Sequence, residues 1–218
     1  NVRILTWKKE FNYSAINNFA VREARGEYLL FLNNDVEIIT ENWLEEMLQL
    51  CQQKDVGMAG AKLYYPDDTI QHAGVVVGLG GVAAHVLCKL PLYAEGYMGR
   101  LRCVQEISAV TAACMMVKTS VFKAVGGFDE ELKVAFNDID LCMKVRKYGV
   151  KIVFTPYAEL YHYESKSRGL EDTPEKVARF NKEIATFEKK WPEILKNGDP
   201  YYNPNLTLKS QDFSLKRI

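Results

Sequence analysis

Hydrophobic runs alternate with amphipathic stretches along this chain. An apolar run over Tyr28 to Leu32 and a segment near Val56 to Tyr65 predict strands, and Ile107 to Val117 is a second long apolar run. Runs of this kind are typical of strands covered by helices on both faces, as in a parallel sheet. Amphipathic spacing predicts helices that are capped by Ser14 and Thr40, each followed by one of these strands. The alternation indicates an α/β layer architecture.

The middle of the chain has a different pattern. From Thr69 to about Gln105 the sequence is rich in glycine and has no sustained helical period. It therefore predicts short strands and loops at the rim of a site. A helix is predicted to start near Asn137 and to end at Tyr148-Gly149. We then expect a strand over 150–154 that stops at Pro156, before a separate short piece over 159–162.

The C-terminal part predicts a helix and a tail. After a polar linker over 165–172, Thr173 is suited to cap a helix and Pro174 to occupy its first position. An apolar stripe follows at intervals of three and four: Val177, Phe180, Ile184, Phe187 and Trp191. Residues 199–205 are rich in proline and asparagine and predict an extended tail. We expect one domain over 1–172, with residues 173–218 packed on it.

Composition excludes several classes of protein. The chain has 28 basic and 28 acidic residues among 218, so no net charge attracts nucleic acid or an anionic membrane. No apolar run approaches the length of a membrane span, and no signal peptide is visible. The five cysteines are scattered, which indicates buried thiols of a reducing cytoplasm.

The first polar cluster that suggests chemistry is Asn33-Asn34-Asp35, which directly follows an apolar strand. In open α/β sheets the ligand binds beyond the carboxyl ends of the strands, so Asp35 is placed where a binding site would form. The alternative is that these residues only turn the chain, since asparagine and aspartate favour turns.

A second cluster lies at the start of the helix that begins near Asn137. Asp138 is near the helix N-terminus, where the dipole and free amides favour the ionised form that a general base needs. The alternative is that Asp138 only caps the helix, and for Asp140 a structural role is the stronger reading. With His162, the two clusters supply oxygen ligands, a carboxylate and an imidazole, the parts of a metal-assisted displacement at a phosphorylated substrate.

An ordered series of motifs extends over nearly the whole chain. It comprises Asn18, Ala24-Arg25-Gly26-Glu27-Tyr28, Leu30-Phe31-Leu32-Asn33-Asn34-Asp35, Gly57-Met58-Ala59-Gly60-Ala61-Lys62-Leu63, Ile70-Gln71-His72-Ala73-Gly74, Thr111-Ala112-Ala113-Cys114, Gly126-Gly127-Phe128-Asp129-Glu130, Asn137-Asp138-Ile139-Asp140-Leu141, Tyr157-Ala158-Glu159-Leu160-Tyr161-His162 and Asp199-Pro200-Tyr201-Tyr202-Asn203-Pro204. Through this series the chain resembles the family-2 glycosyltransferases, in particular the bacterial members that build surface polysaccharides. The resemblance implies a GT-A-type, Rossmann-like mixed sheet flanked by helices.

The resemblance also implies a donor side of the site. Asn33-Asn34-Asp35 occupies the family's DXD position, with Asn33 in place of the usual first aspartate. Asp35 would be the main protein ligand of Mn²⁺ or Mg²⁺ on the diphosphate of a nucleotide-sugar donor, and His162 would complete the metal site unless it is only a packed histidine. Asn33, Asn34 and Asn18 would contact the donor.

On the acceptor side, Asn137-Asp138 stands where the family has Glu-Asp. Asp138 would deprotonate a hydroxyl of a saccharide or glycolipid acceptor, which attacks the anomeric carbon with inversion. Asn137, Asp140 and Lys144 would lie near the acceptor, and the alternative for Lys144 is a solvated position on the helix.

The family's Pro-Thr-Tyr-Asn strand end and its base-reading aspartate are not found in this chain. We therefore expect about the first hundred residues of the usual domain to be missing, which leaves the metal and acceptor half of the site. The prediction is weak or no activity for this part alone, and association between copies through an exposed sheet edge. The resemblance further implies a cytoplasmic location, with peripheral attachment at the inner face of the membrane left open.

Two other functions compete with this reading. A sugar-phosphate nucleotidyltransferase can use a similar fold and metal-binding carboxylates. A non-catalytic carbohydrate-binding domain is the second, but such a domain needs no base, so the presence of both Asp35 and Asp138 argues against it.

Overall fold

A mixed sheet forms the centre of the molecule in a computed structural model that describes residues 2–164 and 173–217. Within these residues the sheet has seven strands in the order β1-β8-β3-β9-β2, with β4 paired to β3 and β7 paired to β9. The strands are β1 (Tyr28–Leu32), β2 (Val36–Ile38), β3 (Val56–Tyr64), β4 (Ile70–His72), β7 (Gln105–Glu106), β8 (Cys114–Lys118) and β9 (Lys151–His162). A separate hairpin joins β5 (Val75–Val77) to β6 (Ala83–His85).

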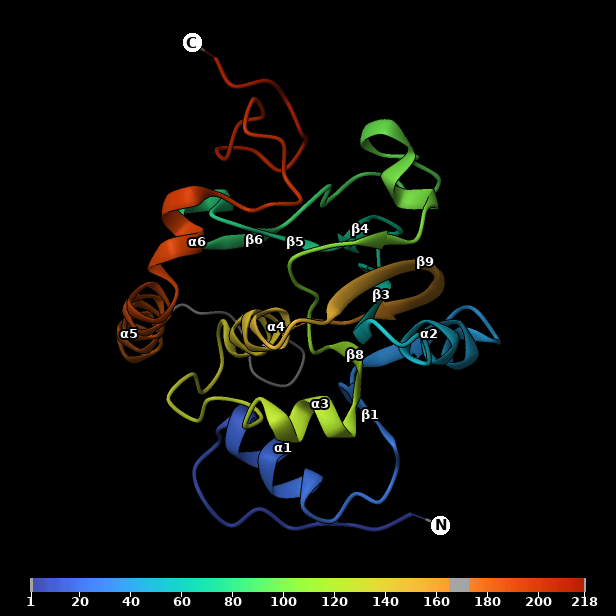
Figure 1. The fold of residues 1–218 in the computed structure, drawn as a ribbon, viewed down its shortest axis with the longest axis vertical. Coiled ribbons are helices and arrows are strands. Elements are labelled where there is room, and N and C mark those ends of the chain that lie inside the picture. Colours follow the sequence, from blue (N-terminus) through green and yellow to red (C-terminus); the bar gives the residue numbers. More distant parts are fainter. Residues whose placement is uncertain (1, 165–172, 218) are drawn as a thin grey trace.

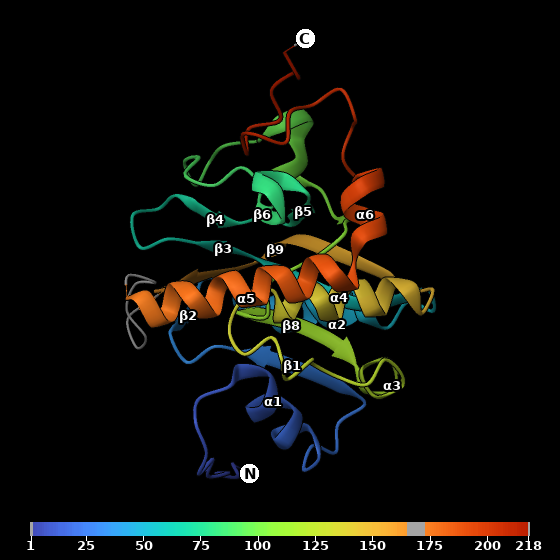
Figure 2. The same cartoon turned by 90° about the vertical axis from the view of Figure 1, so that its left-hand side faces the viewer.

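Helices cover both faces of this sheet (Figures 1 and 2). On one side lies α2 (Trp43–Cys51), and on the other lie α4 (Asn137–Lys147) and α5 (Pro174–Lys190). The remaining helices are α1 (Tyr13–Val21), α3 (Thr119–Ala124), α6 (Pro192–Asn197) and the 3-10 helices η1 (Leu79–Gly81) and η2 (Tyr97–Arg102). No helix in the described part of the chain is both long and apolar enough to cross a membrane.

Strand pairing determines where the polar clusters meet. β3 and β9 run parallel, while β8 is antiparallel to β1 and β3. β2 pairs antiparallel with β9 so that Val36 is opposite His162. Because Asp35 immediately precedes β2, this register brings Asp35 beside the carboxyl end of β9.

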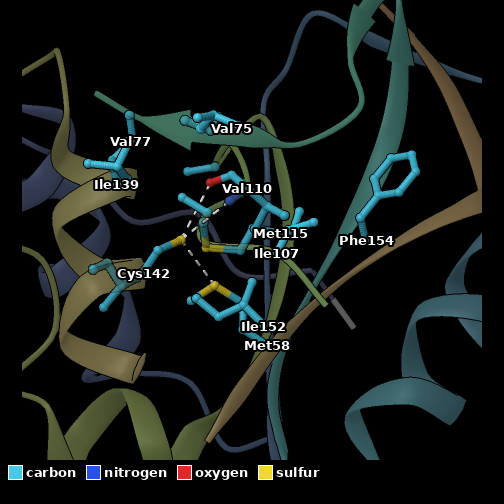
Figure 3. Packing of buried hydrophobic residues seen from close by; sticks show 14 of the residues in the cluster. Met58, Val75, Val77, Ile107, Val110, Met115, Ile139, Cys142, Ile152 and Phe154 are labelled. Atoms are coloured by element: carbon cyan, nitrogen blue, oxygen red, sulfur yellow. Dashed lines mark hydrogen bonds between the residues drawn. The ribbon is translucent and has the colours of Figure 1, made fainter. Parts of the chain in front are cut away.

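Buried apolar residues pack on both faces of the sheet. On the α4 face, the Cys142 thiol lies 3.5 Å from the Met58 sulfur and contacts the main chain of Val110 (Figure 3). Both Cys142 and Met58 are fully buried. These contacts fix α4 against β3 and against the segment that leads into β8, so the first turn of α4 has a defined place relative to the sheet.

Several local predictions differ from the structure. The N-cap of α1 is Asn12, whose side chain accepts from Ala15 N, whereas Ser14 is buried and donates to the Leu132 oxygen. The N-cap of α2 is Asn42 instead of Thr40, whose hydroxyl accepts from Glu159 N. In both cases the predicted cap residue bonds to a distant segment, which local spacing cannot show.

The predicted break at Pro156 is also wrong, because β9 continues from Lys151 to His162. Its pairing with β3 shifts register between Gly60 and Lys62, opposite the segment that contains the proline. Proline lacks an N–H and is tolerated in a sheet at such an irregularity.

β1 lies at one end of the sheet order and pairs with β8 alone among the described residues. Only Leu29 and Phe31 of this strand are buried, so burial alternates. The prediction of burial on both faces is therefore wrong for β1. Association of copies through its edge remains a prediction, and the linker at 165–172 lies outside the described residues.

Candidate active site

Asp35 and His162 form a close pair at one end of the sheet. The Asp35 carboxylate Oδ1 lies 3.2 Å from His162 Nε2, and the Asn33 amide nitrogen lies 3.2 Å from the same ring nitrogen. A main-chain hydrogen bond also joins the two strand ends, because Tyr163 N donates to the main-chain oxygen of Asp35 at 2.8 Å. Three residues that the sequence assigned to the donor and metal site are thus brought together.

The chemistry of this pair suits a divalent cation. Asp35 Oδ1 is buried and has no hydrogen-bond donor among the described residues. The approach of His162 is an ion pair only if the ring is protonated, and burial lowers the pKa of His162 despite the opposing effect of Asp35. A neutral imidazole nitrogen beside a carboxylate oxygen that lacks a donor is a fitting donor set for Mn²⁺ or Mg²⁺.

The protein would supply only part of the coordination shell. Within residues 2–164 and 173–217, no group of three or more His, Cys, Asp or Glu side chains could hold a metal ion. Cations of the Mg²⁺ type are commonly held by one or two protein ligands together with substrate phosphates and water. Asp35 and His162 therefore fit a metal site that a phosphorylated substrate completes.

Asp138 lies in the first turn of α4 and is half-buried. Its Oδ2 accepts from Ala112 N at 3.1 Å and its Oδ1 accepts from Ile139 N at 2.9 Å. Each oxygen keeps a lone pair beyond these bonds, so the carboxylate is held in place and can still accept a proton. The flanking Asn137 and Asp140 side chains are buried.

Residues 111–113, which we call the strap, connect the metal pair to Asp138. Asn33 N donates to the Ala113 oxygen at 3.0 Å, and Ala112 N donates to Asp138. The Tyr13 hydroxyl donates to the Ala112 oxygen at 3.1 Å. Burial and the charge of Asp138 both raise the pKa of Tyr13, so its phenol stays a donor. A candidate metal ligand set and a candidate base are thus held on one segment.

A cavity of about 510 Å³ opens beside His162 and the strap. It is lined mainly by polar side chains: Tyr65, Gln71, His85, Cys88, Lys89, Thr111, His162, Glu164 and Gln211, with Ala83 and Ala84. A larger hollow of about 920 Å³ lies within the tail and contains none of the candidate site residues. The smaller cavity is therefore the one that can admit a substrate to this site.

Asp140 is not where the sequence assignment to the acceptor requires it. The residue is 0 % exposed, its Oδ2 lies 3.0 Å from Lys144 Nζ, and its Oδ1 accepts from the Trp191 indole at 2.9 Å. Lys190 also contacts Oδ1, at 2.6 Å. A carboxylate enclosed in this way cannot touch an acceptor, so we correct its role to that of an anchor between α4 and the end of α5.

Asn137 and Lys144 are likewise engaged within the protein. The Asn137 amide donates to the Val134 oxygen at 2.9 Å, and Lys144 donates to the Gly127 oxygen at 3.0 Å as well as pairing with Asp140. Their side chains stabilise the start of α4 and the loop beside it. The structure thus offers no support for their direct contact with an acceptor.

Replacing Asp140 with asparagine is expected to lower the free energy of unfolding by about 3 kcal/mol, because it leaves the partly buried Lys144 without a carboxylate and Lys190 with Asp129 alone. Lys144 and Lys190 are 21 % and 28 % exposed, so solvent compensates little. Urea unfolding measures the effect. The exposed Lys189→Ala on α5 is the control and should change stability by less than about 0.5 kcal/mol. Equal stability of Asp140→Asn and wild type would contradict the anchor role.

Asn18 lies apart from the metal pair. Its amide donates to the Phe128 oxygen at 2.9 Å and its carbonyl accepts from Phe128 N at 3.0 Å. Both ends of the side chain are therefore used to hold the loop after α3. Asn34 is exposed in the turn between β1 and β2 and directly precedes Asp35.

Other residues of the site were not singled out from the sequence. Gln71 contacts His162, and Glu183 on α5 accepts from Val134 N and Ala135 N at 2.9 and 3.0 Å. The latter bonds hold the chain just before Phe136, whose φ of +59° lies in the left-handed region. Gln71 belongs to a motif of the ordered series, but nothing in the pattern marked it as a partner of His162.

A pair of histidines supports the strap. His72 Nε2 accepts from Thr111 N at 3.4 Å, and its Nδ1 lies 3.0 Å from Nδ1 of His85. Since His72 Nε2 accepts, its proton is on Nδ1 and is donated to His85. The arrangement requires both rings to be neutral, because protonating His85 would place two N–H groups face to face.

The histidine pair predicts loss of stability in acid. Burial, His85 and His162 lower the pKa of His72 well below its ordinary value. Burial and His162 likewise lower the pKa of His85, although Asp138 and Glu164 oppose this. A depressed histidine pKa gives stability that is present above the unfolded value of about 6.5 and is lost as pH falls toward the folded value.

Between pH 7.5 and 5.5, we expect His72 to contribute a loss of about 1.4 kcal/mol in the free energy of unfolding. His72→Gln retains an acceptor for Thr111 N but does not titrate. Between pH 7.5 and 5.5, its free energy of unfolding should therefore fall by about 1.4 kcal/mol less than that of wild type. Urea unfolding at the two pH values provides the comparison. An unchanged pH dependence in the variant would show that His72 does not titrate on unfolding in this range.

Comparison with known proteins agrees with this geometry. Residues 1–183 match the model of a family described as glycosyltransferase like. The uncharacterized protein y4gI of Sinorhizobium fredii is 55 % identical over 215 residues, and the O-antigen biosynthesis protein RfbC of Myxococcus xanthus is 42 % identical over 217 residues. Each match covers 98 % of this chain but only 24 % and 16 % of those proteins. The chain thus spans about a quarter or less of their length.

Two solved structures share the fold. GalNAc-T7, solved with UDP, GalNAc and Mn²⁺, gives a TM-score of 0.64 at 13 % identity and covers 87 % of this chain and 36 % of its own. The mannosyltransferase PcManGT of Pyrobaculum calidifontis, in complex with GDP-Man and Mn²⁺, gives 0.54 at 15 % identity and covers 84 % and 45 %. The family match and these folds together establish that the chain belongs to the glycosyltransferase like family and has the GT-A fold.

Proposed function

We propose that this chain forms the metal and acceptor half of an inverting glycosyltransferase that acts in surface polysaccharide synthesis. It would transfer a sugar from a nucleotide-sugar donor to a hydroxyl of a polysaccharide or glycolipid. The observation that carries the proposal is the Asp35–His162 pair, held by the strap next to Asp138; its buried Asp35 Oδ1 has no donor within residues 2–164 and 173–217. The name of the Myxococcus xanthus relative, the UDP and GalNAc in one related structure and the GDP-Man in the other support it.

Asp138 would act as the base. Its carboxylate accepts the proton of the acceptor hydroxyl, the hydroxyl oxygen forms a bond to the anomeric carbon, and the bond from that carbon to the diphosphate breaks. Attack from the face opposite the leaving group inverts the anomeric configuration. The bonds from Ala112 N and Ile139 N fix the direction of the carboxylate, which is the requirement for proton transfer in a defined geometry.

Asp35 and His162 would hold the Mn²⁺ or Mg²⁺ ion. When bound, such an ion neutralises the negative charge of a diphosphate leaving group. The chain contributes a buried carboxylate oxygen and a ring nitrogen at 3.2 Å from each other. Asn33, which contacts the same nitrogen, would also donate a hydrogen bond to the donor.

The cavity beside His162 would receive the acceptor. It reaches from Thr111 on the strap to Tyr65 and Lys89, and the tail contributes Gln211 to its wall. An aromatic ring with amide and hydroxyl groups is a suitable lining for a saccharide, because the ring packs against C–H faces and the polar groups bond to hydroxyls. This location replaces the one that the sequence suggested around Asp140.

A donor screen tests the proposal. The intact protein is incubated with UDP-, GDP- and dTDP-sugars and saccharide acceptors, with Mn²⁺ or with EDTA, and release of nucleoside diphosphate is measured. Metal-dependent release that requires an acceptor is the expected result. Release of pyrophosphate from a nucleoside triphosphate and a sugar phosphate would instead identify a nucleotidyltransferase.

A further inference from the structure

We propose that Gln71 is a positioning residue for the metal pair and that it locks His162 in the tautomer whose Nε2 carries a lone pair, which faces the Asn33 amide in this structure and can instead bind a cation. The inference rests on the proposed function, because it has a consequence only if Asp35 and His162 hold a metal ion. Gln71 is 4 % exposed and belongs to β4, which is paired with β3, so its position is fixed by the sheet.

Neighbouring atoms identify the two ends of the Gln71 side chain. Its Nε2 lies 3.2 Å from the main-chain oxygen of His162 and 3.3 Å from the Glu164 carboxylate, and both of these groups are acceptors. The amide nitrogen therefore faces these oxygens, and Oε1 is the end that lies 2.8 Å from His162 Nδ1. A carboxamide oxygen only accepts hydrogen bonds, so Nδ1 must carry a hydrogen.

The position of this hydrogen decides what Nε2 can do. A neutral imidazole has one N–H, so with the proton on Nδ1 the lone pair of Nε2 is directed toward Asp35 Oδ1 and the Asn33 amide. In the other tautomer Nε2 would donate to Asp35 Oδ1, and the two ligands would satisfy each other without a cation. Gln71 excludes this hydrogen bond between His162 and Asp35. The Nε2 lone pair and Asp35 Oδ1 therefore both remain acceptors, directed toward the same point.

Partners of this kind affect metal sites measurably. A ligating histidine commonly donates its second N–H to a fixed acceptor, and loss of that acceptor typically lowers metal affinity by about 10–100-fold. Here the acceptor is a neutral amide, which fixes the tautomer without adding negative charge. The geometry thus assigns a positioning role to Gln71, the residue of the motif Ile70-Gln71-His72-Ala73-Gly74 that contacts His162.

Two substitutions of Gln71 and one control test the inference. Gln71→Leu removes the acceptor with little change in size, whereas Gln71→Glu retains an acceptor for Nδ1. Gln105→Leu is the matched control, because the Gln105 amide likewise has two acceptors, here both main-chain oxygens, but belongs to β7, away from the pair. Ring ¹⁵N shifts report the tautomer of His162, which is one of only three histidines. Electron paramagnetic resonance of free Mn²⁺, with the metal alone as probe, reports affinity.

We expect the Nδ1–H tautomer in wild type, Gln71→Glu and Gln105→Leu, and a shift toward Nε2–H in Gln71→Leu together with about 10–100-fold weaker Mn²⁺ binding. Gln71→Leu with unchanged tautomer and affinity would overturn the inference while the metal site stands. Wild-type protein that binds no Mn²⁺ either alone or with UDP or GDP, or Asp35→Asn that binds it like wild type, would overturn the metal site and with it the role of Gln71.

Discussion

Replacing Asp138 with asparagine is expected to lower kcat for sugar transfer by about 10²–10⁴-fold, the usual contribution of general base catalysis. Asparagine has the same shape and can still accept from Ala112 N, but it cannot take a proton from an acceptor hydroxyl. Donor binding should remain, since Asp138 contacts the strap and not the Asp35–His162 pair. Turnover of the intact protein and calorimetric titration of the donor nucleotide in Mn²⁺ measure the two quantities separately.

Two further variants complete this test. Asp55→Asn changes an exposed carboxylate that pairs with Lys151 at the far end of β9, so its turnover should match wild type. Asp138→Glu keeps a carboxylate but displaces it by one methylene, so we expect intermediate turnover. If Asp138→Asn turns over at the wild-type rate, Asp138 only caps α4 and the base must be sought among the residues that line the cavity.

The sequence pattern predicted correctly those elements that have the same burial along their whole length or begin at a local capping signal. All nine residues of β3 are buried, and the segment has no charged or polar side chain except Lys62 and the Tyr64 hydroxyl, as expected of a strand covered on both faces. The start of α5 was equally readable, because Thr173 and Pro174 are local signals and the Thr173 hydroxyl does accept from Lys176 N. β9 was divided in two because the tolerance for Pro156 depends on register with β3, which is a non-local property.

The site shows the same division between local and non-local information. Asp35, Asp138 and His162 were singled out from the sequence because each stands at the end or the start of an element, and the structure brings Asp35 and His162 together. Asp140 was misplaced because two residues in the first turn of one helix face different directions, and only the packing of Lys190 and Trp191 reveals which is interior. Gln71 was not linked to His162 because the two are 91 residues apart and meet only in the folded sheet.

Replacing Asp35 with asparagine is expected to abolish metal-dependent donor binding. The carboxylate is one of the two protein groups that fit the cation, and a neutral amide oxygen is a much weaker ligand for Mn²⁺ or Mg²⁺. In wild type, Mn²⁺ with nucleoside diphosphate at about 100 times its Kd should stabilise the fold by about 2.7 kcal/mol. In Asp35→Asn this increment should vanish in thermal unfolding, whereas Asp55→Asn should retain it.

The stability of the metal-free protein separates a functional Asp35 from a structural one. If Asp35 only turned the chain, its loss would weaken the fold with or without metal. Its Oδ1, however, is buried and has no donor in the part of the chain that the structure describes, and an unsatisfied buried polar atom costs about 1–3 kcal/mol. The asparagine amide can donate to His162 Nε2, so the metal-free variant should be at least as stable as wild type. A variant that is weaker without metal would favour the turn role. If the variant is as stable as wild type without metal and gains no stability from Mn²⁺, the buried, unsatisfied Asp35 carboxylate at this strand end serves metal binding and not the fold.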